Sequence, residues 1–126
     1  RPHYYALLYG SPVPGYAAPE YTIAPGTRVS RSLMAIVRDA IADDRLVPAD
    51  AGAVRDAADH LAFAVLSTEL ALNAPDATLL AALVAWTQLF GLLSFELFGQ
   101  TVGLVDDHEA FFRDAVTATG RAIGLR

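Results

Sequence analysis

The sequence contains no cysteine and no lysine. Without cysteine it has no disulfide framework, no thiol chemistry and no cysteine-based zinc site. Without lysine it has neither a Schiff-base lysine nor a P-loop lysine for phosphate. The basic side chains are therefore all arginine, and 9 of them against 14 acidic residues leave a net charge of −5. An acidic chain is repelled by phosphates, so this segment is not expected to bind DNA or RNA by itself.

Charged residues make up only 18% of the 126 residues, while hydrophobic residues make up 54%. Both values are shifted towards burial, and they exclude intrinsic disorder. A chain of 13.4 kDa is expected to form one domain. Its accessible surface is expected to be roughly 6,500 Å² when folded, against roughly 19,000 Å² when unfolded. We therefore expect it to pack compactly or to bury surface against a partner. Because the first residue is Arg rather than Met, we also expect a piece of a longer protein.

Apolar residues recur at helical spacing in five segments, and no segment shows the alternation of a half-buried strand. The expected helices cover residues 3–9, about 17 residues after Thr27, and then 50–72, 77–99 and about 107–123. Thr27 and Asp76 are expected N-caps, and Asp106 followed by Glu109 resembles a capping box. Residues 10–26 hold four prolines and three glycines and are expected to form a long irregular connection. The predicted class is an all-α bundle of about five helices.

The predicted helix 77–99 carries no charge from Leu79 to Phe95, a run of 17 residues. About 20 apolar residues are needed to span a bilayer. This run is shorter, has Gln88 in its middle and is followed at once by Glu96. We therefore expect a helix that is buried on nearly all sides of a soluble assembly, with no membrane partner.

Residues 85–97, with the sequence AWTQLFGLLSFEL, resemble the tryptophan–histidine–glycine C-terminal domain of the TetR/AcrR family of bacterial transcriptional regulators. Trp86 and Gly91 stand where that motif has its Trp and Gly, whereas Phe90 stands at the position of its His. The opening residues 1–10 are similar to the start of the same region. Helix order and the Pro-rich connection also agree, so the resemblance covers essentially the whole chain.

The resemblance implies that residues 1–126 form a C-terminal ligand-binding and dimerisation domain, with residues 76–123 as the dimerisation helices. It implies an N-terminal helix-turn-helix head, outside this sequence, as the only part that binds operator DNA. A small effector would alter the spacing of the two heads in a cytoplasmic homodimer. We expect a repressor that is released by a mainly apolar effector.

The predicted long helix has two apolar faces, and a single layer of helices has too few elements to cover both. The face with small residues is expected to form a two-fold four-helix bundle between subunits, together with the last helix. The expected dimer-interface residues are Ala81, Ala85, Gln88, Leu92, Phe95, Gly99, Phe111, Phe112, Ala115, Val116, Thr119 and Ile123. The alternative is a monomer in which a missing N-terminal part covers this face.

The opposite face of the same helix is expected to border the effector pocket. Small-molecule sites are mostly apolar and aromatic with few polar groups. The expected ligand-binding residues have that character: Tyr5, Tyr9, Met34, Val37, Phe63, Leu66, Trp86, Phe90 and Ser94. The alternative is that these residues are ordinary packed core, in which case the chain is a purely structural helical dimerisation module without a ligand pocket.

Catalysis has little support in the sequence. The three histidines, His3, His60 and His108, are far apart and lack the spacing of metal ligands. The serines lie outside any nucleophile-elbow context, and there is no Gly-rich phosphate loop. We therefore expect no catalytic residue, no metal site and no cofactor, and we expect that the protein is not an enzyme.

Overall fold

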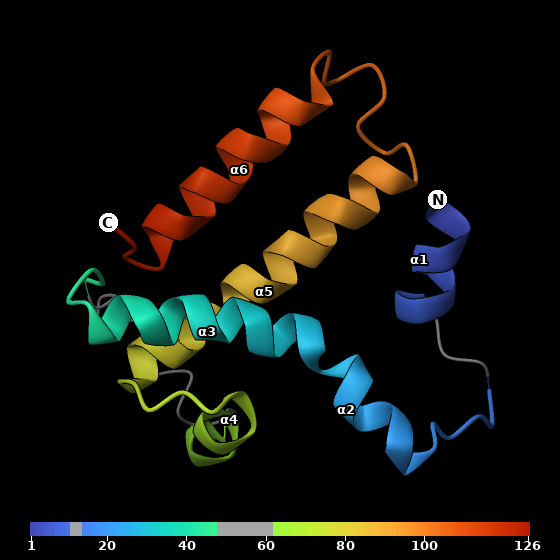
Figure 1. Cartoon of the computed structure of the whole chain (residues 1–126). Helices are drawn as coiled ribbons and strands as arrows, with labels where there is room; N and C mark the ends of the chain where they lie inside the picture. Colours follow the sequence, from blue (N-terminus) through green and yellow to red (C-terminus); the bar gives the residue numbers. More distant parts are fainter. Residues whose placement is uncertain (11–13, 48–61) are drawn as a thin grey trace.

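A computed structural model of the chain describes residues 1–10, 14–47 and 62–126. All regular elements among these residues are helices and none is a strand, which confirms the all-α class. The elements are α1 (Pro2–Tyr9), the 3-10 helix η1 (Glu20–Thr22), α2 (Ile23–Gly26), α3 (Arg28–Ala42), α4 (Phe63–Leu70), α5 (Asp76–Leu97) and α6 (His108–Ala122). Helices α5 and α6 lie side by side, and α3 crosses the beginning of α5 and the end of α6 (Figure 1).

The core lies at this crossing. Met34 and Val37 on α3 pack with Leu79 and Ala82 on α5 and with Ile123 after α6, and all five are buried. On α3 they belong to an apolar stripe whose spacing follows the helical repeat, which is why α3 turns this side inward. The core is therefore built from one end of the α5–α6 pair, and the other end of that pair lies beyond it.

The starts of two helices differ from the sequence-based expectation. Thr27 does precede α3, but its side chain makes no capping bond and its hydroxyl donates to the Ala24 carbonyl at 3.3 Å. Its backbone is helical, with φ −88° and ψ 0°, because α2 runs directly into α3. A capping side chain needs an extended backbone at that position. Asp76 is the first residue of α5 rather than its cap, since Pro75 takes the cap position, and its charge faces the positive end of the helix dipole.

The cap of the last helix lies one residue later than expected. Asp107, which has an extended backbone, accepts a hydrogen bond from the Ala110 N–H at 2.9 Å through its Oδ1. The expected pair of Asp106 and Glu109 forms no capping box, because Asp107 occupies the N-cap and Glu109 then falls in the first turn. Glu109 instead forms an exposed ion pair with Arg113 at 2.8 Å.

Two predicted segments are only partly reproduced. The connection 10–26 was expected to be irregular throughout, but its second half forms η1 and α2, which contact each other. Of the predicted helix 50–72, the structure describes only Phe63–Leu70 as helical, and residues 48–61 lie outside the described part.

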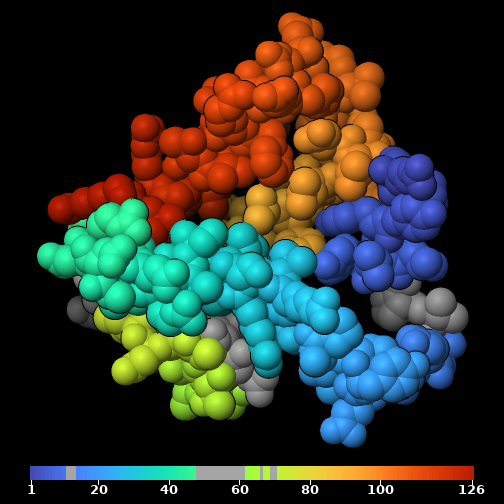
Figure 2. All heavy atoms as spheres, in the orientation of Figure 1, coloured from blue at the N-terminus to red at the C-terminus, as the bar shows by residue number. Residues whose placement is uncertain are grey.

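The isolated chain is less compact than its size predicts. Its accessible surface is 8988 Å². A compact monomer of this mass exposes roughly 6,500 Å², so about 2,500 Å² is in excess. In α1 and α6 no residue is buried. In Figure 2 the surface of α5 is visible between those of α3 and α6. Of the two expectations, compact packing and burial against a partner, the single chain does not fulfil the first and does not test the second.

Candidate functional site

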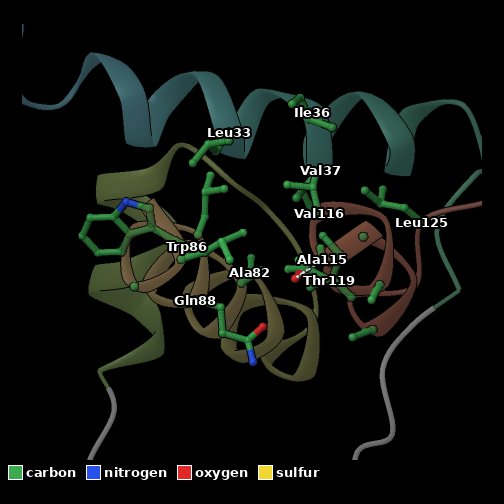
Figure 3. Close-up of a pocket in the computed structure, with 18 of the residues that line it drawn as sticks. Leu33, Ile36, Val37, Ala82, Trp86, Gln88, Ala115, Val116, Thr119 and Leu125 are labelled. Carbon is green, nitrogen blue, oxygen red and sulfur yellow. Dashed lines mark hydrogen bonds between the residues drawn. The ribbon is translucent and has the colours of Figure 1, made fainter. Parts of the chain in front are cut away.

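An apolar groove of about 700 Å³ runs between α3, α5 and α6. Helix α3 forms one side with Leu33, Ile36 and Val37, and α5 and α6 form the two walls (Figure 3). The residues that line it are Leu33, Met34, Ile36, Val37, Ala82, Ala85, Trp86, Gln88, Leu89, Gly91, Leu92, Phe95, Thr101, Phe111, Ala115, Val116, Ala118, Thr119, Gly120, Ala122, Ile123 and Leu125. Leu125 near the C-terminus lines the groove, and beside it the Val47 N–H donates to the Gly124 carbonyl at 2.9 Å.

None of these lining residues is charged, and apart from the indole N–H of Trp86 the polar side chains are those of Gln88, Thr101 and Thr119. The Thr119 hydroxyl donates to the Ala115 carbonyl of its own helix at 2.9 Å, and the Thr101 hydroxyl oxygen is buried. Gln88 is exposed and points its amide away from α3 (Figure 3). The groove therefore suits an uncharged, mainly apolar molecule, since a buried charge here would find no partner.

The rim of the groove carries two exposed apolar stripes with the same spacing. The α5 seam consists of Val84, Gln88, Gly91 and Phe95, all exposed. The α6 seam consists of Phe111, Ala115, Ala118 and Ala122, of which Ala115 is half-buried. Both follow intervals of four, three and four residues, which is the spacing of the core positions in a coiled coil. Stripes with this spacing are typical of helices that pack against other helices.

The opposite side of α5 holds α1 through an aromatic cluster. The Tyr5 hydroxyl lies 2.8 Å from the Ser94 Oγ and 3.1 Å from the Phe90 carbonyl oxygen. The ring of Tyr9 meets that of Phe90 edge-on, with centroids 4.9 Å apart, and Phe90 in turn meets Trp86 at 5.8 Å. Trp86 therefore touches both sides of α5, because it also lines the groove.

Seven of the nine predicted ligand-binding residues are divided between these two places. Met34, Val37 and Trp86 line the groove. Tyr5, Tyr9, Phe90 and Ser94 form the cluster between α1 and α5. Phe63 packs against the core, and the side chain of Leu66 lies outside the described part of the structure. The structure thus brings together the members on each side of α5 but not all nine.

Most of the predicted dimer-interface residues line the groove. These are Ala85, Gln88, Leu92, Phe95, Phe111, Ala115, Val116, Thr119 and Ile123, and Ile123 is also part of the core. Ala81 packs against the core, Phe112 is half-buried, and Gly99 lies exposed just after α5 with φ +72°.

Sequence reasoning did not assign the α3 side of the groove beyond Met34 and Val37. Leu33 and Ile36 were recognisable as members of an apolar helical stripe, but a stripe does not show what it faces. Gly91 and Ala118 were missed as rim residues because small residues carry little hydrophobic signal. A side chain at Gly91 would meet nothing within 4 Å, so the surface there is open.

Two further features bear on function. Among the described residues no group of three or more His, Asp or Glu side chains is placed to hold a metal ion. Helix α5 is long and apolar enough to cross a membrane by length and composition, and only 17% of its most apolar stretch is buried in the single chain. Length and composition do not distinguish a membrane span from a core helix, and α5 already packs against α3, α4 and α6.

Comparison with known proteins places the chain in a family. The family model described as "Tetracyclin repressor-like, C-terminal domain" matches residues 1–119. Two similar relatives are the HTH-type transcriptional regulator Rv1816 of Mycobacterium tuberculosis and the HTH-type transcriptional regulator Mb1846 of Mycobacterium bovis. Each is 32% identical over 101 residues, which cover 79% of this chain and 42% of the relative. The chain therefore spans about two fifths of the length of these curated relatives, and no solved structure matches it.

Proposed function

The chain belongs to the family of tetracycline-repressor-like C-terminal domains, and from that premise we propose that it is the effector-binding and dimerisation domain of a cytoplasmic bacterial transcriptional repressor. The observation that carries this proposal is the uncharged groove between α3, α5 and α6. Its volume of about 700 Å³ lies within the range of small-molecule sites. The effector is a small, mainly apolar molecule whose binding releases the repressor from its operator.

Operator binding belongs to a helix-turn-helix head outside these residues. The relatives are named HTH-type regulators, and the matched part covers only 42% of their length. The net charge of −5 of the present chain opposes contact with DNA phosphates. The isolated domain should therefore not retard DNA at about 0.15 M salt, where phosphate contacts still support nonspecific binding.

Dimerisation supports the same function, because it would hold two heads at one spacing. The excess of about 2,500 Å² of surface over a compact monomer, and the two exposed seams, are the features that a subunit of a four-helix bundle presents. A second copy, rather than lipid, then covers the exposed side of α5.

The effector site is tested with an uncharged apolar fluorophore, N-phenyl-1-naphthylamine. Trp86 is the only tryptophan and lines the groove, so energy transfer from it reports a bound fluorophore. Ile36 lines the groove and is 54% exposed, so Ile36→Glu should fold and still place a charge in the site. We expect its affinity for the fluorophore to fall at least tenfold.

The matched control is Val29→Glu, which places the same charge on α3 at a residue that is 43% exposed and does not line the groove. Its affinity should equal that of the wild type. If the folded wild-type protein does not bind the fluorophore at all, the effector site is refuted. The chain would then be the alternative, a structural dimerisation module without a ligand pocket.

A further inference from the structure

We infer that the effector carries a hydrogen-bond acceptor, such as a carbonyl or ether oxygen, which the indole N–H of Trp86 recognises. The inference rests on the proposed function and makes its ligand class more specific. An apolar groove by itself favours a plain hydrocarbon, because every polar atom of a ligand gives up its water on entry. A buried donor in the wall reverses that preference for a ligand whose oxygen it can bond.

The polar side chains of the groove fall into two groups. Gln88 is exposed and points its amide away from α3, and the Thr119 hydroxyl already donates to the Ala115 carbonyl at 2.9 Å (Figure 3). The Trp86 Nε1 and the Thr101 Oγ1 are instead buried, and neither has a hydrogen-bond partner among the residues that the structure describes. Only this second group has hydrogen-bonding capacity left for a ligand.

Within the second group, the indole nitrogen is the atom that needs an acceptor from outside the chain. A threonine hydroxyl both donates and accepts, and it can rotate towards a nearby backbone carbonyl, as that of Thr119 does. The indole N–H only donates, and its direction is fixed in the plane of the ring. A buried tryptophan usually finds a partner for this group, and a buried donor without one destabilises the free protein. A ligand oxygen at Trp86 removes that penalty.

Trp86 is placed where a ligand in the groove can supply the oxygen. The side chain is half-buried and lines the groove with Leu33 and Leu89. Figure 3 shows the ring on the Leu33 side, with its nitrogen on the edge nearer α3. The ring of Phe90 meets the indole edge-on at 5.8 Å and helps to hold its orientation. Leu33 is a flexible, partly buried side chain, so a ligand that displaces it gains access to the indole edge.

The charge of the groove narrows the class of ligand further. A carboxylate also has acceptor oxygens, but no residue that lines the groove is charged, so its charge would be buried without a partner. A hydrocarbon leaves the indole N–H as it is in the free domain. The ligand class is therefore a neutral, mainly apolar molecule with an acceptor oxygen, as in ketones, esters and ethers.

The first test uses two ligands that differ only in the acceptor, 2-acetylnaphthalene and 2-ethylnaphthalene. Trp86 is the only tryptophan, so the protein has a single indole N–H resonance in its proton–nitrogen NMR spectrum. We expect 2-acetylnaphthalene to shift the indole proton downfield and to slow its exchange with solvent, relative to 2-ethylnaphthalene, which carries the same ring system. If both ligands bind and leave the same indole signal, the inference is overturned and the proposed effector site stands.

The second test measures how strongly the groove prefers the acetyl over the ethyl compound. Competition against N-phenyl-1-naphthylamine, excited directly, gives both affinities in each variant. Trp86→Phe keeps an aromatic ring and removes the N–H, and we expect it to reduce the preference at least about fivefold, the factor for one hydrogen bond. Thr119→Val is the matched control. It removes a hydroxyl that also lines the groove but is already bonded, so the preference should not change.

The remaining outcomes separate the inference from the proposed function. An unchanged preference in folded Trp86→Phe overturns the inference. A preference that Thr101→Val reduces and Trp86→Phe does not would place the acceptor beside Thr101, and it overturns the role of Trp86 as well. If Trp86→Phe does not fold, the NMR comparison on the wild-type protein decides. If the folded wild type binds neither naphthalene nor the fluorophore, the proposed effector site fails, and the inference fails with it.

Discussion

The hydroxyl group of Tyr5 is the polar tie between α1 and the rest of the domain, and its removal in Tyr5→Phe is a sharp test of the structure. Together with Ser94 it satisfies the Phe90 carbonyl at the back of α5. Each hydroxyl has one proton to donate. Either Tyr5 donates to Ser94 and Ser94 to the carbonyl, or Ser94 donates to Tyr5 and Tyr5 to the carbonyl. Tyr5→Phe removes the link between the helices in both arrangements.

The expected effect is local, because α1 is held on α5 only by this hydroxyl and by ring contacts such as that of Tyr9 with Phe90 among the described residues. No residue of α1 is buried, and Leu7 is 83% exposed. A partly buried hydrogen bond contributes about 1 kcal/mol net. That amount changes the balance between docked and undocked α1 by a factor of about five. Once undocked, a helix of eight residues melts, because isolated helices shorter than about 12 residues are marginal in water.

Amide hydrogen exchange measures this balance directly. We expect the amides of α1 to exchange about five times faster in Tyr5→Phe, because that is the factor that corresponds to the lost hydrogen bond. The amides of the α3–α5 core should keep their rates. Tyr4→Phe is the matched control, since Tyr4 lies on the same helix with its ring exposed. Equal rates in Tyr5→Phe and the wild type, or an equal acceleration in Tyr4→Phe, would show that the hydroxyl of Tyr5 does not tie α1 to α5.

Three further predictions test the rest of the fold. Leu79→Ala should lower the free energy of unfolding by about 2–5 kcal/mol, because Leu79 is fully buried in the core; urea denaturation measures this, and the exposed Leu104→Ala should change it by less than about 0.5 kcal/mol. Gly124→Ala should also destabilise the protein, by at least about 1 kcal/mol in the same assay, because its φ of +92° disfavours a side chain and the new Cβ would collide with neighbouring backbone; unchanged stability would contradict this loop geometry. Asp107→Ala should cost about 1 kcal/mol through the lost N-cap, whereas Asp106→Ala should cost little; the opposite order in thermal unfolding would restore the capping box expected from sequence.

The choice between Asp106 and Asp107 illustrates what local sequence leaves undecided. Both are acidic residues at the start of the same apolar stripe, so either satisfies the pattern of an N-cap. The decision depends on which residue has an extended backbone, and here that is Asp107, with φ −117° and ψ 94°. Thr27 is a second example. Its side chain is of a type that caps helices, but its backbone is helical because α2 directly precedes it, so it makes no capping bond. Dihedral angles at one position are set by how neighbouring helices meet.

By itself, the sequence determined the all-α class, the approximate helices and the resemblance to the regulator family. It also placed on α5 a run of 17 uncharged residues, from Leu79 to Phe95. Such a run has no polar face to serve as a reference, so helical periodicity cannot say which side meets which neighbour. Only the tertiary structure decided that α1 docks on one side through Tyr5, and that α3 and α6 border an open groove on the other. The residues of one helix determine that it will be buried. Which neighbour covers each of its faces depends on how several helices cross.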